Sequence, residues 1–517
     1  MNEKVNEEGT DENIREPGSD SETETEKYTL KDGLQPLLKN WPLLVLFVSW
    51  LLFSTGVFIS TFSIQKQEGK QAIPQNVAIM EKAINLIFFE DEMGALGREA
   101  VTSFGKEVTQ EFENILEENP ENSEIIYKYY MVKSVFTRNG EEGSEKNGEV
   151  AGDVFEKYAP HMENESIKRI LYDIYFQEKL EYLEKEKKEN YQAMIESNLD
   201  NWYKNYTLLR FYQLTEQPDK AEQLTRQLQN QMMPLIYGLI FVALIMTGGL
   251  FVGPVILIIL IVLTATRYKK SALEFSDLRL KKPESLYNLL SIEKALLIFL
   301  VWEIIRNGFG LLARFLFTDY KNFPPLMMFS GYLGVYLFTF FVSFRVISSD
   351  YHKFSLSMIG IKIRDFVDGL KKSGLGIAGY FAVVPVVVGL TVLYSLLLKN
   401  TPESINPAFD ILRNATGTQL VFIWLVIGLF GPIFEEFLFR GIIYTSVRKY
   451  MTAMPAIILV SFLFAFIHYD IWVTFNLFVL GAMLALLYER SGSLIPSIVV
   501  HCIWNTVTFL TFITLLK

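Results

Sequence analysis

The chain has 517 residues, of which 50% are hydrophobic, and a formal net charge of −10 at pH 7. Its apolar residues concentrate in long runs after residue 232, which excludes a purely soluble protein and favours an all-α, polytopic membrane protein with an attached soluble part. The acidic balance lies in the tail and the soluble region and excludes a nucleic-acid partner, and the single cysteine, Cys502, excludes a disulfide framework.

The first half of the chain is predicted to hold a tail, an anchor and a helical domain. Residues 1–40 are acidic and poor in apolar side chains, so we expect a disordered tail. The apolar run at 41–64 has no short basic segment before it, which predicts a retained transmembrane anchor. Residues 65–232 show helical apolar spacing, which predicts a helical bundle. Segments 116–136 and 208–228 weakly resemble tetratricopeptide repeats, although an ordinary bundle is the simpler interpretation.

The second half is predicted to be mostly membrane helix. Residues 233–289 contain one apolar run and a strongly basic loop, and residues 290–517 contain the remaining apolar runs. With the anchor, this pattern predicts about nine spans. The expected spans are 41–63, 234–266, 292–317, 326–346, 375–398, 417–445, 454–470, 471–489 and 494–516.

Basic residues in short loops predict the orientation. Loops 267–290, 347–374 and 446–453 are basic, and they all lie on one side of the membrane if the N-terminus is cytoplasmic. The helical domain is then extracytoplasmic, where it could bind a protein partner. The Lys/Glu-rich soluble part and the absence of disulfides favour a bacterial plasma membrane.

A charge cluster interrupts the apolar run at 431–444, GPIFEEFLFRGIIY. An ionisable side chain at mid-bilayer costs roughly 2.5–3.5 kcal/mol on insertion scales, so several in one helix predict a use. Glu436 and Arg440 are four residues apart with the acid first, which favours an ion pair. Glu435 points about 100° away and is left free to act as a general base. The alternative is a buried network that only holds the helices together.

Two further motifs place polar residues on helix faces. Phe464 and His468 are four residues apart, as are His501 and Asn505. Taken alone, a histidine at a helix end is more often structural, and an asparagine inside a span can serve only as an interhelical hydrogen-bonding group. Taken with the glutamates, these residues can activate a water for attack on a carbonyl and stabilise the oxyanion that forms.

Another intramembrane pair is read as structural. Glu303 and Arg306 are three residues apart on one predicted helix, and they most simply pair with each other.

The ordered motifs EExxxR, FxxxH and HxxxN resemble the CPBP family of intramembrane proteases, which includes type II CAAX prenyl endopeptidases and Abi proteins of bacteriocin processing and self-immunity. The resemblance covers about residues 290–516, with its motifs between 431 and 505. It implies a helical membrane core with a polar cavity. It also implies that Glu435 is the water-activating base and that Glu436 and Arg440 support it.

The resemblance assigns the remaining motif residues as well. It implies that His468 and His501 bind a divalent metal or the activated water, and that Asn505 stabilises the oxyanion. With Glu435 as a third ligand, the metal expected is zinc.

The leading hypothesis is therefore a glutamate-dependent intramembrane metalloendopeptidase that cleaves a membrane-associated peptide or protein. The first alternative is a non-catalytic membrane scaffold or regulator of the same family. A proton-coupled transporter is a further alternative, because buried carboxylates and histidines also form proton relays.

Overall fold

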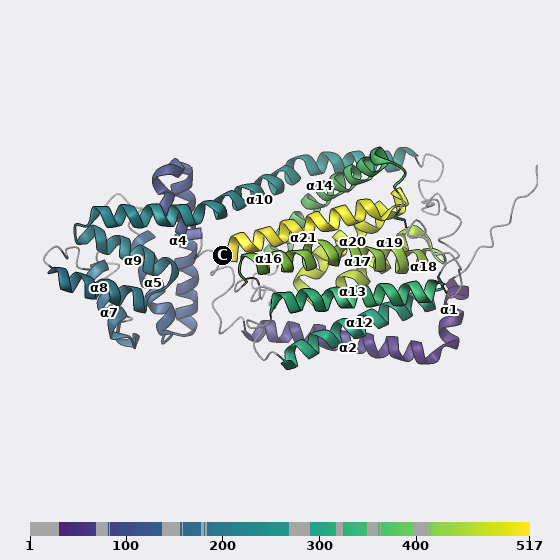
Figure 1. Ribbon diagram of the computed structural model, residues 1–517, viewed down its shortest axis with the longest axis horizontal. Helices are drawn as coiled ribbons and strands as arrows, with labels where there is room; N and C mark the ends of the chain where they lie inside the picture. The colour runs from purple at the N-terminus through teal and green to yellow at the C-terminus, as the bar shows by residue number, and fades with distance from the viewer. Residues whose placement is uncertain are drawn as a thin grey trace, which may run out of the picture.

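The computed structural model shows a helical protein with two parts (Figure 1). It describes residues 30–68, 83–136, 159–176, 183–267, 290–316, 324–348, 363–397 and 415–516, and a few single residues between these ranges. No strand occurs in this described part of the chain, which confirms the all-α fold class.

Among the described residues, seven helical segments are long and apolar enough to cross a membrane, which confirms a multi-pass membrane protein. They are Pro218–Val262, Ile292–Ala313, Leu326–Ser348, Phe366–Tyr394, Gly417–Arg448, Val473–Ser491 and Leu494–Thr514. The count rises to eight if the bent pair of α1 (Leu30–Lys39) and α2 (Trp41–Glu68) is one span. The expectation of about nine spans is corrected accordingly.

The expected span at 454–470 accounts for part of this difference. It corresponds to α19 (Ala453–Phe466), an apolar helix of 14 residues. At about 1.5 Å per residue this helix covers roughly 21 Å, which is less than the roughly 30 Å of hydrocarbon in a bilayer. Its C-terminal turn, which carries His468, connects directly to α20 (Ile471–Ser491).

The soluble part is a bundle of helices with its own apolar core. Its elements are η1 (Ile84–Phe89), α4 (Glu90–Glu118), α5 (Ser123–Phe136), η2 (Ala159–His161), α7 (Glu165–Leu171), η3 (Tyr172–Phe176), α8 (Lys185–Asn198), α9 (Asn201–Leu214) and the start of α10 (Pro218–Arg267). Buried aromatic side chains such as Trp202, Tyr203 and Phe211 fill the core. Burial and the nearby Glu81 carboxylate raise the pKa of Tyr203, so its hydroxyl stays protonated and donates to Glu81.

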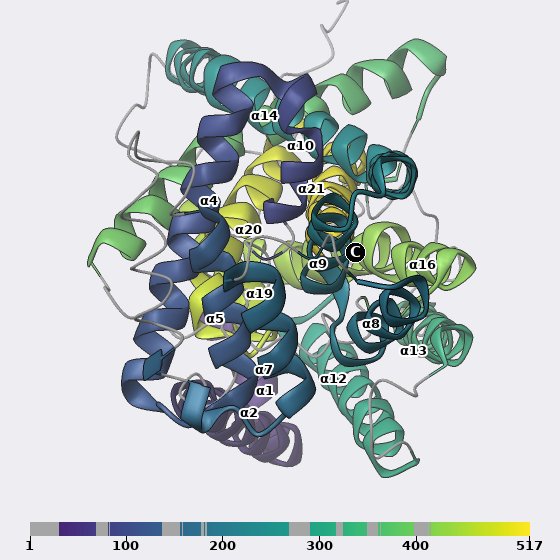
Figure 2. The same ribbon diagram turned by 90° about the vertical axis from the view of Figure 1, so that its left-hand side faces the viewer.

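The bundle lies at one end of the membrane helices. Figure 2 looks at this end and shows α4, α5, α8 and α9 in front of the membrane helices. The two segments with a weak repeat likeness, 116–136 and 208–228, each contain a helix, a turn and a second helix. The tetratricopeptide assignment itself stays a prediction.

The helix α10 belongs to both parts. It runs without a break from the bundle into the membrane region, so the predicted boundary between 65–232 and 233–289 falls inside one helix (Figure 1). The two internal prolines, Pro234 and Pro254, do not end it.

The N-terminal helix α1 lies at the end of the membrane helices opposite to the bundle (Figure 1). It forms within the tail expected to be disordered over 1–40, of which residues 1–29 lie outside the described residues. Between α1 and α2 the chain turns by 98°, and Asn40 there donates to Glu293 of α12 at 2.6 Å.

The rest of the membrane part surrounds one segmented helix. Its elements are α12 (Ile292–Leu316), α13 (Pro325–Ser348), α14 (Phe366–Leu397), α16 (Gly417–Trp424), η7 (Leu425–Phe430), α17 (Gly431–Glu436), η8 (Phe437–Tyr444), α18 (Thr445–Arg448), α19, α20 and α21 (Leu494–Leu516). The five elements from α16 to α18 form the single span Gly417–Arg448. Much of the first two basic loops used to predict orientation lies outside the described residues.

Candidate active site

The two glutamates lie on a short α-helical segment between two π-helical ones. Glu435 and Glu436 end α17, with the π-helical segment η7 before it and η8 after it. Such wide turns are uncommon and occur frequently at functional sites. A widened turn can change which side chains share a helix face, but Glu436 and Arg440 still meet as their spacing of four residues predicts.

Glu436 and Arg440 form a buried ion pair. Arg440 Nη1 lies 2.8 Å from Glu436 Oε1, and both side chains are 0% exposed. Arg440 Nη2 also donates to the carbonyl oxygen of Gly481 on α20 at 2.9 Å. Because the pair is closed to solvent and tied to a second helix, it connects the glutamate segment to α20.

His501 reaches the same carboxylate from α21. Its Nδ1 lies 2.9 Å from Glu436 Oε1. A carboxylate paired with an arginine accepts hydrogen bonds, so we assign the proton to Nδ1 and the lone pair to Nε2. Oε2 of Glu436 is buried and finds no hydrogen-bond partner in the described residues.

Glu435 faces the other side of the same imidazole. Its Oε2 lies 3.7 Å from His501 Nε2, and its side chain is 19% exposed. This separation is too long for a hydrogen bond, but one water molecule can contact both atoms from the side. The two adjacent glutamates therefore have different surroundings: the Glu436 side chain is fully buried, and the Glu435 side chain is partly exposed.

Phe464 joins the three motifs. Its ring lies 4.7 Å from Arg440 Cζ, and its centroid is 5.2 Å from that of His468 and 5.6 Å from that of His501. The phenylalanine of FxxxH is thus a fully buried spacer between the arginine and both imidazoles.

His468 lies in the turn after α19. Its Nδ1 is 2.9 Å from the carbonyl oxygen of Phe464. A carbonyl oxygen only accepts, so Nδ1 carries the proton and Nε2 is left with its lone pair. The residue itself is exposed, in contrast to His501, which is buried.

Asn505 is one turn beyond His501 on α21. Its Nδ2 donates to the carbonyl oxygen of Ile427 in η7 at 2.8 Å. This contact satisfies a carbonyl of the π-helical segment and links α21 to the segment before the glutamates. The motif residues thus come together from three separate parts of the chain, and their catalytic roles stay predictions.

One group close to the site was not assigned to it from the sequence. Arg306 of α12 contacts the turn that carries His468, because its Nη2 lies 3.2 Å from the carbonyl oxygen of Ile467. The i,i+3 spacing of Glu303 and Arg306 predicted their ion pair correctly, with Nη2 and Oε1 2.8 Å apart. No pattern in the sequence connected this pair to His468.

The zinc ligands predicted from the resemblance are His468, His501 and Glu435. Within the described residues, no group of three or more His, Cys, Asp or Glu side chains is placed to hold a metal ion. Nδ1 of His501 contacts Glu436 and Nδ1 of His468 contacts Phe464, which leaves Nε2 of each imidazole with its lone pair. The zinc expectation stays a prediction, and the mechanism proposed for this site does not use it.

The comparisons with known proteins agree with the motif resemblance. Residues 417–507 match the family model described as type II CAAX prenyl endopeptidase Rce1-like. No curated protein and no solved structure matches the chain. The family is typically one of proteases, which supports a protease reading at the general level. The segment that carries EExxxR, FxxxH and HxxxN therefore matches the Rce1-like type II CAAX prenyl endopeptidase family model, which is consistent with the CPBP resemblance.

Proposed function

We propose that this protein is an intramembrane endopeptidase that hydrolyses a membrane-associated peptide or protein with a water activated by Glu435. The observation that carries the proposal is the pairing of Glu435 Oε2 with His501 Nε2 at 3.7 Å, next to the closed Glu436–Arg440 ion pair. An accessible carboxylate and an imidazole lone pair on either side of one position are suited to orient a water and remove its proton.

The reaction follows from these positions. Glu435 takes one proton from the water while Nε2 of His501 accepts a hydrogen bond from the other. The water oxygen bonds to the carbonyl carbon of the substrate, and the carbonyl electrons move to its oxygen. When this oxyanion collapses, the C–N bond breaks and Glu435 returns its proton to the leaving nitrogen. General-base catalysis of this kind contributes about 10²–10⁴-fold.

The neighbouring residues support the two reacting groups. Glu436 accepts from His501 Nδ1 and so keeps Nε2 free of a proton. Arg440 neutralises Glu436, which would otherwise be a buried, uncompensated charge. Asn505 is proposed to donate a hydrogen bond to the oxyanion, and the exposed His468 is proposed to bind the water. In an apolar site, such fixed dipoles act more strongly than in water.

The proposal includes the orientation of the protein in the membrane and the class of its substrate. The N-terminus is cytoplasmic in a plasma membrane, and the bundle outside recruits or selects substrates. The substrate class is a membrane-associated peptide, with or without a prenyl group.

The test compares Glu435→Gln with the wild-type protein and with Glu222→Gln, which changes an exposed glutamate in the bundle end of α10. Each protein is reconstituted in liposomes with membrane proteins of the expressing cells, and new peptide termini are counted by mass spectrometry. Wild type and Glu222→Gln should produce the same termini, and Glu435→Gln should produce them at least about 10²-fold more slowly. Equal rates for Glu435→Gln would refute the mechanism, and no termini with wild type would refute the peptidase function.

A further inference from the structure

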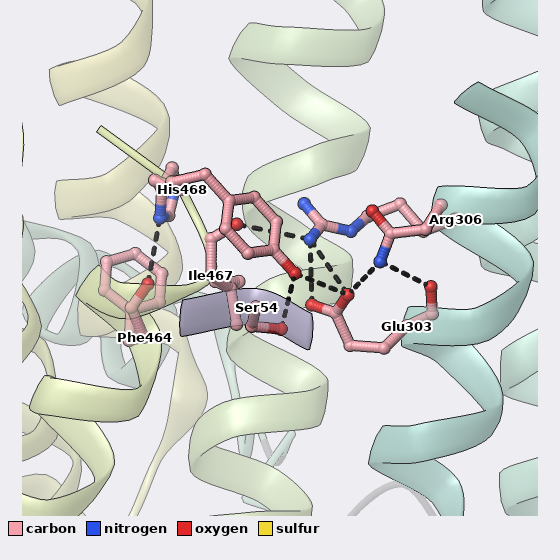
Figure 3. A network of polar contacts seen from close by, with 8 residues as sticks. Ser54, Glu303, Arg306, Phe464, Ile467 and His468 are labelled. Carbon is pink, nitrogen blue, oxygen red and sulfur yellow. Dashed lines mark hydrogen bonds and ion pairs between the residues drawn. The ribbon is translucent and has the colours of Figure 1, made fainter. Parts of the chain in front are cut away.

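A polar network lies on α12, outside the segment that matches the family (Figure 3). Arg306 Nη2 contacts both carboxylate oxygens of Glu303, at 2.8 and 3.0 Å. Asn307 Nδ2 donates to Glu303 Oε2 at 2.6 Å. The Glu303 side chain is 0% exposed, so Arg306 and Asn307 supply the partners that a buried carboxylate requires.

Arg306 extends from this pair to the turn after α19. The same Nη2 donates to the carbonyl oxygen of Ile467 at 3.2 Å. Ile467 is the C-cap of α19. The carbonyls at the end of a helix lack partners within that helix and carry the negative end of its dipole, so a cation there is favourable. The residue immediately before His468 is therefore held by α12.

Tyr469, the residue immediately after His468, is held by the same network. Its φ of +54° lies in the left-handed region, which a tyrosine rarely adopts without restraint from its surroundings. Its hydroxyl lies 3.2 Å from Ser54 Oγ on α2 and 3.5 Å from Glu303 Oε2, and its ring is 5.7 Å from Arg306 Cζ. Figure 3 shows Ser54, Glu303 and Arg306 beside the turn that carries Ile467 and His468.

We propose that Glu303 and Arg306 are positioning residues that fix the turn 467–469 and thereby orient the imidazole of His468. Arg306 binds the backbone on one side of His468, and Tyr469 binds Glu303 and the anchor helix α2 on the other. Neither Glu303 nor Arg306 touches the reacting atoms. The effect on catalysis rests on the proposed function, whereas the effect on the turn does not.

A purely structural ion pair would behave differently when both charges are removed. Replacing one partner leaves a buried charge without compensation, which is destabilising for either role. The double variant Glu303→Met/Arg306→Met removes both charges at similar volume and is expected to fold. If the pair only neutralises itself, this double variant behaves as wild type. If the pair positions the turn, the double variant folds and still loses the contact with Ile467.

The first measurement is independent of cleavage. A nitroxide is attached to His468→Cys in a Cys502→Ser background, because Cys502 is the only cysteine in the chain. The electron paramagnetic resonance spectrum should show a restrained label, and the Glu303→Met/Arg306→Met change should add a mobile component. An unchanged spectrum in a folded double variant overturns the positioning role.

The second measurement uses the substrate identified by the termini assay. The Glu303→Met/Arg306→Met variant should lower kcat by about 10–100-fold and leave KM within about twofold, because small displacements of a catalytic group have effects of this size. The single variant Arg306→Lys keeps a donor for the carbonyl oxygen of Ile467, so its kcat should lie between that of the Glu303→Met/Arg306→Met variant and that of the wild type.

The matched control is Arg448→Met/Glu489→Met. It removes another buried pair, with Nη2 and Oε1 3.1 Å apart, on the cytoplasmic side of the proposed topology. It should leave kcat unchanged, and a wild-type kcat in the Glu303→Met/Arg306→Met variant would overturn the proposal. If the wild-type protein cleaves nothing, the proposed function fails and the nitroxide spectrum still decides the positioning role.

Discussion

Glu435 and Glu436 are adjacent in the sequence and have opposite surroundings in the structure. Glu436 contacts Arg440 and His501 and has no exposed side-chain surface. Glu435 lies 3.7 Å from His501 and is partly exposed. The difference predicts that substitution of each glutamate affects a different property of the protein.

Glu436→Gln should lower stability and Glu435→Gln should not. The first change leaves Arg440 buried without a compensating charge, and breaking such a pair typically costs about 3–5 kcal/mol. The second change removes a partly exposed carboxylate that lies beyond hydrogen-bond distance of His501, so the free energy of unfolding of the protein should change by less than about 1 kcal/mol. Thermal unfolding in one detergent measures both. Equal losses of stability would contradict the division of roles between the two glutamates.

Chelation should leave the cleavage rate unchanged. No set of three described His, Cys, Asp or Glu side chains is placed to hold a metal, and the proposed mechanism uses only protein groups and water. The check is dialysis of the purified protein against 1,10-phenanthroline, with metal content and cleavage measured before and after. Loss of a stoichiometric metal together with activity, both restored by zinc, would contradict this prediction and support the zinc hypothesis.

The residue patterns predicted contacts within one helix better than contacts between helices. The pairs Glu436–Arg440 and Phe464–His468 follow from a spacing of four residues, and both contacts are present. The contact of His501 with Glu436 joins residues 65 positions apart and depends on how α21 packs beside α17. Spacing along one helix carries no information about such packing.

At the scale of helices, α10 and α14 come close because of small residues on α10. A Cβ on Gly253 would lie 2.2 Å from the carbonyl oxygen of Phe381, and a Cβ on Gly249 would lie 2.7 Å from the Val384 side chain. These glycines are four residues apart, the spacing at which small residues allow membrane helices to approach closely.

Gly253→Ala should therefore weaken the packing of α10 on α14. A backbone oxygen cannot move aside as a flexible side chain can, so the cost should be about 1–3 kcal/mol. Gly248→Ala is the matched control on the same helix, because its nearest neighbour, Phe381 Cε1, would be 3.8 Å away. Thermal unfolding of both variants in detergent measures the difference, and equal unfolding temperatures would contradict the close approach.

The length of α19 shows that apolar composition does not determine where a helix ends. Residues 454–470 were predicted as a span because they are continuously apolar, but the helix ends at Phe466 and the chain turns at Ile467. The contacts of this turn with α12 and α2 come from residues more than 150 positions away. Composition predicted membrane helices well, whereas the place where α19 ends depends on tertiary contacts.

At the scale of the whole molecule, α10 links the soluble bundle to the membrane core. The helix has 50 residues and packs against α9 at one end and against α14 and α21 further along. Since α21 carries His501 and Asn505, the bundle is connected to the candidate site by packed helices. The bundle and α1 lie at opposite ends of the membrane helices (Figure 1), so their positions relative to the membrane test the proposed orientation.

Cysteine labelling in intact cells should place the bundle outside. In a Cys502→Ser background, Lys187→Cys lies on α8, where the native side chain is 65% exposed, and Lys39→Cys lies at the exposed end of α1. Because the positive-inside rule puts the N-terminus in the cytoplasm, a membrane-impermeant maleimide should label position 187 and spare position 39. Both should react after permeabilisation, which controls for accessibility. Labelling of position 39 alone in intact cells would reverse the orientation and place the bundle in the cytoplasm.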